Sequence, residues 1–125
     1  MARILLADDE SMFRKSTKEI LQSLGYRVIE ATNGLEAVDM FSRQPNLIDL
    51  VMLDIIMPGL RGGEAARRMR RIRKDVPILF ASGYDFGEST DNSVRLSHSN
   101  VLKKPFRISQ LSQSIRQLLK ETEQA

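Results

Sequence analysis

Five short apolar runs recur along the chain, and amphipathic patterns lie between them and after the last. The runs cover residues 3–8, 27–31, 49–54, 77–81 and 100–103. Three of the five are almost wholly apolar inside, as strands buried on both faces of a sheet should be. The pattern therefore predicts five strands that pair in a parallel sheet.

Apolar residues at helical spacing follow four of these five runs. The four apolar faces comprise Phe13, Thr17, Ile20, Leu21 and Leu24; Leu35, Val38 and Phe41; Ala66, Met69 and Ile72; and Ile108, Leu111, Ile115, Leu118 and Leu119. Gly25 follows the first face, where a glycine commonly ends a helix. Residues 87–99 are rich in Ser, Asn and Thr, which favour turns, so a regular helix is only weakly predicted there.

Strand and helix alternate along the chain, which is typical of an α/β fold with helices on both faces of a parallel sheet. The 125 residues suffice for one domain, which we place at residues 1–121 with a tail at 122–125. The absence of cysteine excludes a disulfide scaffold and a thiolate metal site. No apolar run reaches the length of a membrane span, and no signal peptide precedes the first strand. We therefore expect a cytoplasmic protein without membrane contact.

The net charge of +3 is concentrated in one segment. Residues 61–74 carry +6, so the rest of the chain carries −3. Such a segment could contact the phosphates of a nucleic acid. However, no aromatic residue is interleaved with the arginines and no DNA-binding motif follows them. We interpret the segment as a solvated helix face and expect no nucleic-acid partner.

Polar side chains come at the carboxyl ends of four of the predicted strands, where ligands of doubly wound sheets bind. They are Asp8 and Asp9, Asp54, Ser82, and the pair Lys103 and Lys104. Strand alternation does not choose between the two lysines. Taken singly, these residues could be helix caps, turn residues or loop lysines. Their joint position at one sheet edge indicates a functional site.

Three carboxylates in one pocket repel one another unless a cation joins them. A hard cation with oxygen ligands, most plausibly Mg²⁺, meets that need. A carboxylate beside such a metal can attack a phosphoryl group and form an acyl phosphate. A lysine ammonium would offset charge on the transferring oxygens, and a hydroxyl opposite could bond the attached phosphate.

Four motifs, taken in order and spacing, carry a family resemblance: ILLADDE at 4–10, LVMLDIIMPG at 50–59, ILFASGY at 78–84 and VLKKPF at 101–106. With them the chain resembles the receiver domains of bacterial response regulators over about residues 3–120. The resemblance implies a flavodoxin-like (βα)₅ fold with the doubly wound strand order 2-1-3-4-5.

The resemblance also implies roles for the residues at the sheet edge. Asp54 matches the phosphoacceptor. Asp9 matches a direct Mg²⁺ ligand, Asp8 a ligand acting largely through water, and the backbone carbonyl of Ile56 completes the protein ligands. Ser82 matches the hydroxyl that contacts the phosphoryl group.

Lys104 matches the family lysine, and the Lys104-Pro105 bond is expected to be cis. The domain would take phosphate from the phosphohistidine of a sensor kinase or a histidine phosphotransfer domain, or from acetyl phosphate. It would be a signalling switch that catalyses its own Mg²⁺-dependent phosphorylation and slow dephosphorylation. An output domain, attached or separate, would respond to its state.

The family often has an aromatic residue where this chain has Val101, so rotation of an aromatic ring at this position cannot signal the phosphorylated state. We expect ordering of residues 85–99 to do so instead.

Two alternative functions remain to be weighed. A phosphatase with an aspartyl nucleophile needs a second Asp two residues on, where this chain has Ile56. A degenerate receiver would act only as an interaction module. Loss of Asp54, Asp9 or Lys104 would favour it, and all three are present.

Overall fold

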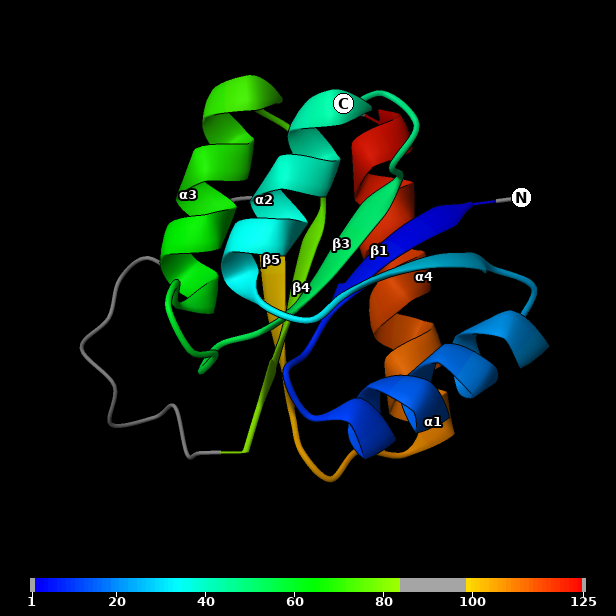
Figure 1. Ribbon diagram of the computed structural model, residues 1–125. Coiled ribbons are helices and arrows are strands. Elements are labelled where there is room, and N and C mark those ends of the chain that lie inside the picture. Colours follow the sequence, from blue (N-terminus) through cyan, green and yellow to red (C-terminus); the bar gives the residue numbers. More distant parts are fainter. Residues whose placement is uncertain (1, 84–98, 125) are drawn as a thin grey trace.

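The computed structural model describes residues 2–83 and 99–124, and the side chains up to residue 121. Its five strands form one parallel sheet in the order β2-β1-β3-β4-β5 (Figure 1). The strands are β1 (Arg3–Ala7), β2 (Arg27–Ala31), β3 (Leu50–Asp54), β4 (Ile78–Ser82) and β5 (Ser99–Lys103). The predicted fold and strand order are confirmed. Residues 85–99, whose ordering we expect to accompany phosphorylation, lie outside the described residues apart from Ser99, and so does Tyr84.

The described helices cover both faces of the sheet. They are α1 (Ser11–Ser23), α2 (Gly34–Arg43), α3 (Gly62–Ile72) and α4 (Ile108–Gln124). Helices α2 and α3 lie on one face, and α1 and α4 on the other (Figure 1). Successive residues of a strand point to opposite faces of the sheet. Val51 packs in the apolar cluster with α2 and α3, and Met52 packs in the cluster with α4. Burial on both faces explains the continuous apolar runs in the sequence.

Local signals in the sequence fix where α2 begins and where α1 ends. The Asn33 side chain accepts a hydrogen bond of 2.8 Å from the Glu36 N–H, which caps the start of α2. Gly25 follows the C-cap of α1 with φ +97°, a conformation that costs glycine little. The predicted helix end at Gly25 is confirmed.

Gly62 sets how closely α3 approaches the end of β3. Its N–H donates to the carbonyl of Ile55 at 2.9 Å. A Cβ on Gly62 would lie 2.9 Å from the Cα of Ile55 and closer still to the carbonyl oxygen of Asp54. Only glycine therefore lets the start of α3 rest on the backbone that carries Asp54.

The arginines of residues 61–74 do not form one uniform face. Arg70 Nε donates to the carbonyl of Val76 at 2.9 Å, and Arg73 Nη1 donates to the carbonyls of Pro45 and Ile48 at 3.1 and 2.6 Å. Arg67, Arg68 and Arg71 are exposed. The prediction of a solvated face thus holds for part of the segment, whereas Arg70 and Arg73 join α3 to neighbouring loops.

Among residues 2–83 and 99–124 there is no helix whose length and apolarity would let it cross a membrane.

Candidate functional site

The strand register brings the predicted polar residues to one edge of the sheet. Ala7 pairs with Leu53, so the residues that follow them, Asp8 and Asp54, lie at the same level. Asp54 in turn pairs with Ala81 of β4, and Ser82 comes one residue later. Parallel strands thereby turn positions far apart in the sequence into neighbours, as the sequence predicts.

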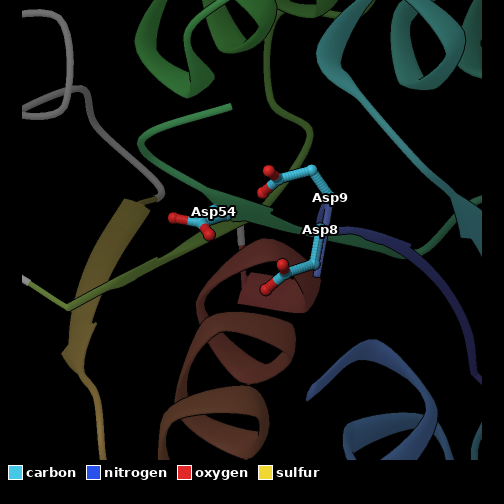
Figure 2. Close-up of side chains that lie close together, drawn as sticks. All are labelled: Asp8, Asp9 and Asp54. Atoms are coloured by element: carbon cyan, nitrogen blue, oxygen red, sulfur yellow. The ribbon is translucent and has the colours of Figure 1, made fainter. Parts of the chain in front are cut away.

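The carboxylates of Asp8, Asp9 and Asp54 converge beyond the ends of β1 and β3 (Figure 2). Each offers an oxygen that lies within 4.8 Å of the oxygens of the other two. Their environments differ, since Asp8 is only 1% exposed whereas Asp9 is exposed and Asp54 is intermediate. The cluster therefore has a buried wall at Asp8 and an open side at Asp9.

Lys104 is the lysine that reaches this cluster. Its Nζ donates to Asp8 Oδ2 at 2.9 Å and to Asp54 Oδ2 at 3.1 Å, while Lys103 is exposed on β5. The Lys104 N–H donates to the carbonyl of Ser82, and the Lys104-Pro105 bond is cis, as the resemblance predicts. The structure thus makes the choice between the two lysines that strand alternation leaves open.

Backbone groups hold the other carboxylate oxygens. The Glu10 N–H donates to Asp8 Oδ1 at 2.9 Å, and the Ile56 N–H donates to Asp54 Oδ1 at 3.2 Å. Arg14 Nη1 donates to the main-chain carbonyl of Asp8 at 2.7 Å. In Asp8 and in Asp54, one carboxylate oxygen thus accepts from a backbone N–H and the other from Lys104. Both carboxylates are held in place, so little reorganisation is needed before a ligand binds.

Burial raises the pKa of Asp54, and it outweighs the hydrogen bond and charge of Lys104, while the charge of Asp8 adds to the rise. Burial also lowers the pKa of Lys104. The hydrogen bonds and charges of Asp8 and Asp54 together more than reverse that effect, so the pKa of Lys104 is raised. The Lys104 ammonium has two carboxylate partners, whereas Asp8 and Asp54 share one ammonium. The same contacts therefore raise the pKa of Lys104 but do not prevent the rise in the pKa of Asp54.

The charge of the cluster is suited to a divalent cation. When ionised, three carboxylates and one ammonium carry a net charge of −2. Carboxylate oxygens are the ligands that Mg²⁺ and Ca²⁺ prefer, and Mg²⁺ commonly takes one or two carboxylates and keeps several waters. The donor set therefore fits a hard cation at the open side of the cluster.

The remaining predicted residues border this cluster. Ser82 is buried at the end of β4 and takes part in a polar interaction there. Ile56 follows Asp54 in the loop to α3, and its side chain is 44% exposed. The structure thus brings together Asp8, Asp9, Asp54 and Lys104, with Ser82 and Ile56 next to Asp54 in register or in sequence.

Two side chains near the cluster were not anticipated as part of it. The Phe13 ring lies under Lys104, with its centroid 3.9 Å from Nζ. Arg14 bonds the Asp8 carbonyl and also lies 3.4 Å from Glu30 Oε1 of β2. The apolar periodicity assigns Phe13 to a core face, and no signal in the sequence separates such a face from contact with an ammonium.

Comparison with known proteins agrees with this geometry. The family model of the response regulator receiver domain matches residues 4–116. The chain is 34% identical to the response regulator receiver protein CpdR of Brucella abortus, covering 95% of this chain and 98% of that protein. It is 32% identical to the sensor kinase CckA of the same organism, covering 96% of this chain.

The share of each relative that the chain covers differs widely. It spans 13% of CckA and about half of the MprA response regulators of Mycobacterium, in contrast to nearly all of CpdR. Receiver sequences of this kind thus occur alone and within longer proteins.

Solved structures of response regulator proteins are also similar to this chain. A response regulator receiver domain protein of Clostridium thermocellum superposes with a TM-score of 0.91 at 26% identity, over 98% of both chains. The response regulator TrrA of Thermotoga maritima, in complex with Mg²⁺ and BeF, gives a TM-score of 0.84 at 36% identity, over 94% of this chain and 99% of that one.

Proposed function

This chain belongs to the response regulator receiver domain family of two-component signalling, and from that premise we propose that Asp54 accepts a phosphoryl group. The observation that carries the proposal is the meeting of three carboxylates within 4.8 Å with Lys104, whose Nζ bonds both Asp8 and Asp54. A phosphorylated receiver needs a nucleophile, a metal site and a cation for the phosphoryl oxygens in one place, and this cluster supplies the side chains for all three.

The donor is a phosphohistidine of a sensor kinase or a histidine phosphotransfer domain. An Asp54 oxygen attacks phosphorus while the bond from phosphorus to the imidazole nitrogen breaks, and the electron pair of that bond stays with the imidazole. The product is an acyl phosphate on Asp54. Hydrolysis later reverses the change, because water attacks phosphorus and the Asp54 carboxylate leaves.

Lys104 and Ser82 stabilise the transferred group. The Lys104 ammonium already lies 3.1 Å from Asp54 Oδ2, so a small movement brings it to a phosphoryl oxygen attached to that carboxylate. Ser82 ends the neighbouring strand one residue beyond the partner of Asp54, which supports a role for its hydroxyl as a donor to another phosphoryl oxygen. Preorganised donors of this kind stabilise charge that develops during transfer.

Mg²⁺ is the cation that we assign to Asp8, Asp9 and Asp54, with the backbone carbonyl of Ile56 as a further ligand. When bound, it offsets negative charge on the transferring phosphoryl oxygens. Asp9 is the exposed member of the set and is free to turn toward the ion, whereas Asp8 is held by Lys104 and the Glu10 N–H. Asp9 would therefore hold the ion directly, and Asp8 would support it largely through water, as the family resemblance implies.

Phosphorylation by a small donor tests the proposal. With Mg²⁺ and acetyl phosphate, the wild-type chain should gain the mass of one phosphoryl group. Asp54→Asn should not, whereas Asp39→Asn should label like wild type, because Asp39 lies on the exposed side of α2. Labelling of Asp54→Asn at the wild-type rate would refute the assignment.

A receiver that works only as an interaction module is the second candidate. It predicts that wild type takes no phosphoryl group from acetyl phosphate or from a phosphohistidine donor. The convergence of Asp8, Asp9 and Asp54 with the Lys104 ammonium favours the phosphorylated receiver, because a module that only binds partners has no need of such a cluster.

A further inference from the structure

Lys104 has a third neighbour that the proposed function does not use. Besides its hydrogen bonds to Asp8 and Asp54, its Nζ lies 3.9 Å from the centroid of the Phe13 ring. We propose that Phe13 is a positioning residue that holds the Lys104 ammonium beside the two carboxylates, a role that rests on the proposed function of the same site. An ammonium over an aromatic face is attracted by the quadrupole of the ring at distances up to about 6 Å.

The ring of Phe13 is itself held in place. It meets the ring of Phe106 edge to face, with centroids 5.7 Å apart and an interplanar angle of 82°. Phe106 packs against the buried cluster on the α4 side of the sheet, and it lies two residues after Lys104 in the same loop. The loop that carries the lysine therefore also anchors the aromatic ring that faces its ammonium.

This arrangement restricts a side chain that would otherwise be mobile. Lysine has a flexible four-carbon stem and three N–H donors. Two donors bond Asp8 and Asp54, and the Phe13 ring covers a further side of the ammonium, whose side chain is 17% exposed. Removing the ring would let the ammonium reach solvent and other rotamers, so fewer molecules would hold it where the phosphoryl oxygens arrive.

The alternative is that Phe13 serves only as apolar packing for α1. Two substitutions separate the alternatives. Phe13→Tyr keeps the aromatic face, whereas Phe13→Leu keeps an apolar side chain without one. Met12→Leu is the matched control, because Met12 is the preceding residue of α1 and is 79% exposed.

The first measurement does not depend on phosphoryl transfer. Brief acetylation with acetic anhydride, read by peptide mass spectrometry, compares Lys104 with its exposed neighbour Lys103 in the same molecule. The ratio of Lys104 to Lys103 labelling should rise about threefold to tenfold in Phe13→Leu. It should stay at the wild-type value in Phe13→Tyr and Met12→Leu. A wild-type ratio in Phe13→Leu would overturn the inference, whatever the outcome for phosphorylation of Asp54.

The second measurement asks whether the held ammonium matters for transfer. At saturating Mg²⁺, Phe13→Leu should be phosphorylated by acetyl phosphate about threefold to tenfold more slowly than wild type, with Phe13→Tyr restoring the rate. The affinity for Mg²⁺ should stay within about twofold, since the metal ligands are untouched. An equal loss in Phe13→Tyr, or a parallel loss of Mg²⁺ affinity, would show that the ring only packs α1 and would overturn the inference.

Discussion

Asp8 is the most buried charged residue of the cluster, and the bonds that it makes show how the cluster is balanced. One of its oxygens accepts from the Glu10 N–H and the other from Lys104. Lys104 divides its ammonium between Asp8 and Asp54, so within residues 2–83 and 99–121 no lysine or arginine is paired with Asp9. A divalent ion at the open side of the cluster would supply the missing charge, which is the physical basis for assigning Mg²⁺ there.

Asp9→Asn should separate metal binding from folding. We expect the affinity for Mg²⁺ to fall by at least about tenfold, because a direct ligand is lost. The free energy of unfolding without metal should rise by about 0.5–1 kcal/mol, because one of three converging charges is removed. Calorimetric Mg²⁺ titration and urea unfolding with and without Mg²⁺ would measure both effects.

Glu10→Gln is the control, since Glu10 is the adjacent acid and its side chain is not part of the cluster. Its Mg²⁺ affinity should stay close to that of wild type. An unchanged Mg²⁺ titration in Asp9→Asn would refute the metal site.

At this scale the sequence predicts the identity of the polar residues but not all of their partners. Asp8, Asp9 and Asp54 could be found because they lie at or just beyond the carboxyl end of a recognisable strand. The choice of Lys104 over Lys103 needed the family motif, since the two adjacent lysines lie together at the end of one short strand. The contact of Phe13 with Lys104 joins residues 91 positions apart in the chain. No local pattern encodes such a contact.

Among the secondary-structure elements, α3 shows how a basic segment can hold a fold together. Arg73 reaches across to the loop after α2 and donates to the carbonyls of Pro45 and Ile48. Carbonyl groups in such loops have no helical or sheet partner, so a guanidinium with several donors satisfies them efficiently. Part of the positive charge of residues 61–74 is therefore structural.

Arg73→Ala should lower the free energy of unfolding by about 1–3 kcal/mol, because two carbonyls lose a charged donor. Arg71→Ala removes the same type of side chain from the last turn of α3, where it is exposed, and it should change stability by less than about 0.5 kcal/mol. Urea unfolding of the two variants would decide. Equal effects of the two substitutions would contradict the structural role of Arg73.

The strands and the four helices that the apolar pattern predicts agree with the described elements to within a few residues. The apolar runs could be recognised as strands because they are short and alternate with longer amphipathic segments. The fit of Gly62 against the backbone of Asp54 could not be predicted, because it depends on how closely α3 approaches β3. Glycine in a helix start has several explanations in sequence, and only the packed structure selects one.

At the scale of the whole molecule, the basic character invites a nucleic-acid partner, and the structure argues against it. Arg70 and Arg73 are engaged by carbonyl groups, which leaves fewer side chains to contact phosphates. We therefore expect no sequence-selective complex with duplex DNA at physiological salt. A gel-shift titration at several salt concentrations is the measurement, and nanomolar, sequence-selective binding would contradict the expectation.

The doubly wound topology explains why one short chain can hold the whole site. Neighbouring parallel strands bring Asp8, Asp54, Ser82 and Lys104 to the same edge, although these residues are spread over most of the sequence. Since both faces are covered by helices, this edge is where polar groups can converge without disturbing the core. The fold thus accounts for the position of the site, and the side chains account for its chemistry.

Phosphorylation of Asp54 is tested most directly by identifying the residue that carries the phosphoryl group. After phosphorylation with acetyl phosphate and Mg²⁺, treatment with borohydride reduces an aspartyl phosphate to homoserine, and peptide mass spectrometry locates the new residue. We expect homoserine at position 54 alone, and none when Mg²⁺ is removed. Homoserine at another aspartate, or the same yield at position 54 without Mg²⁺, would contradict it.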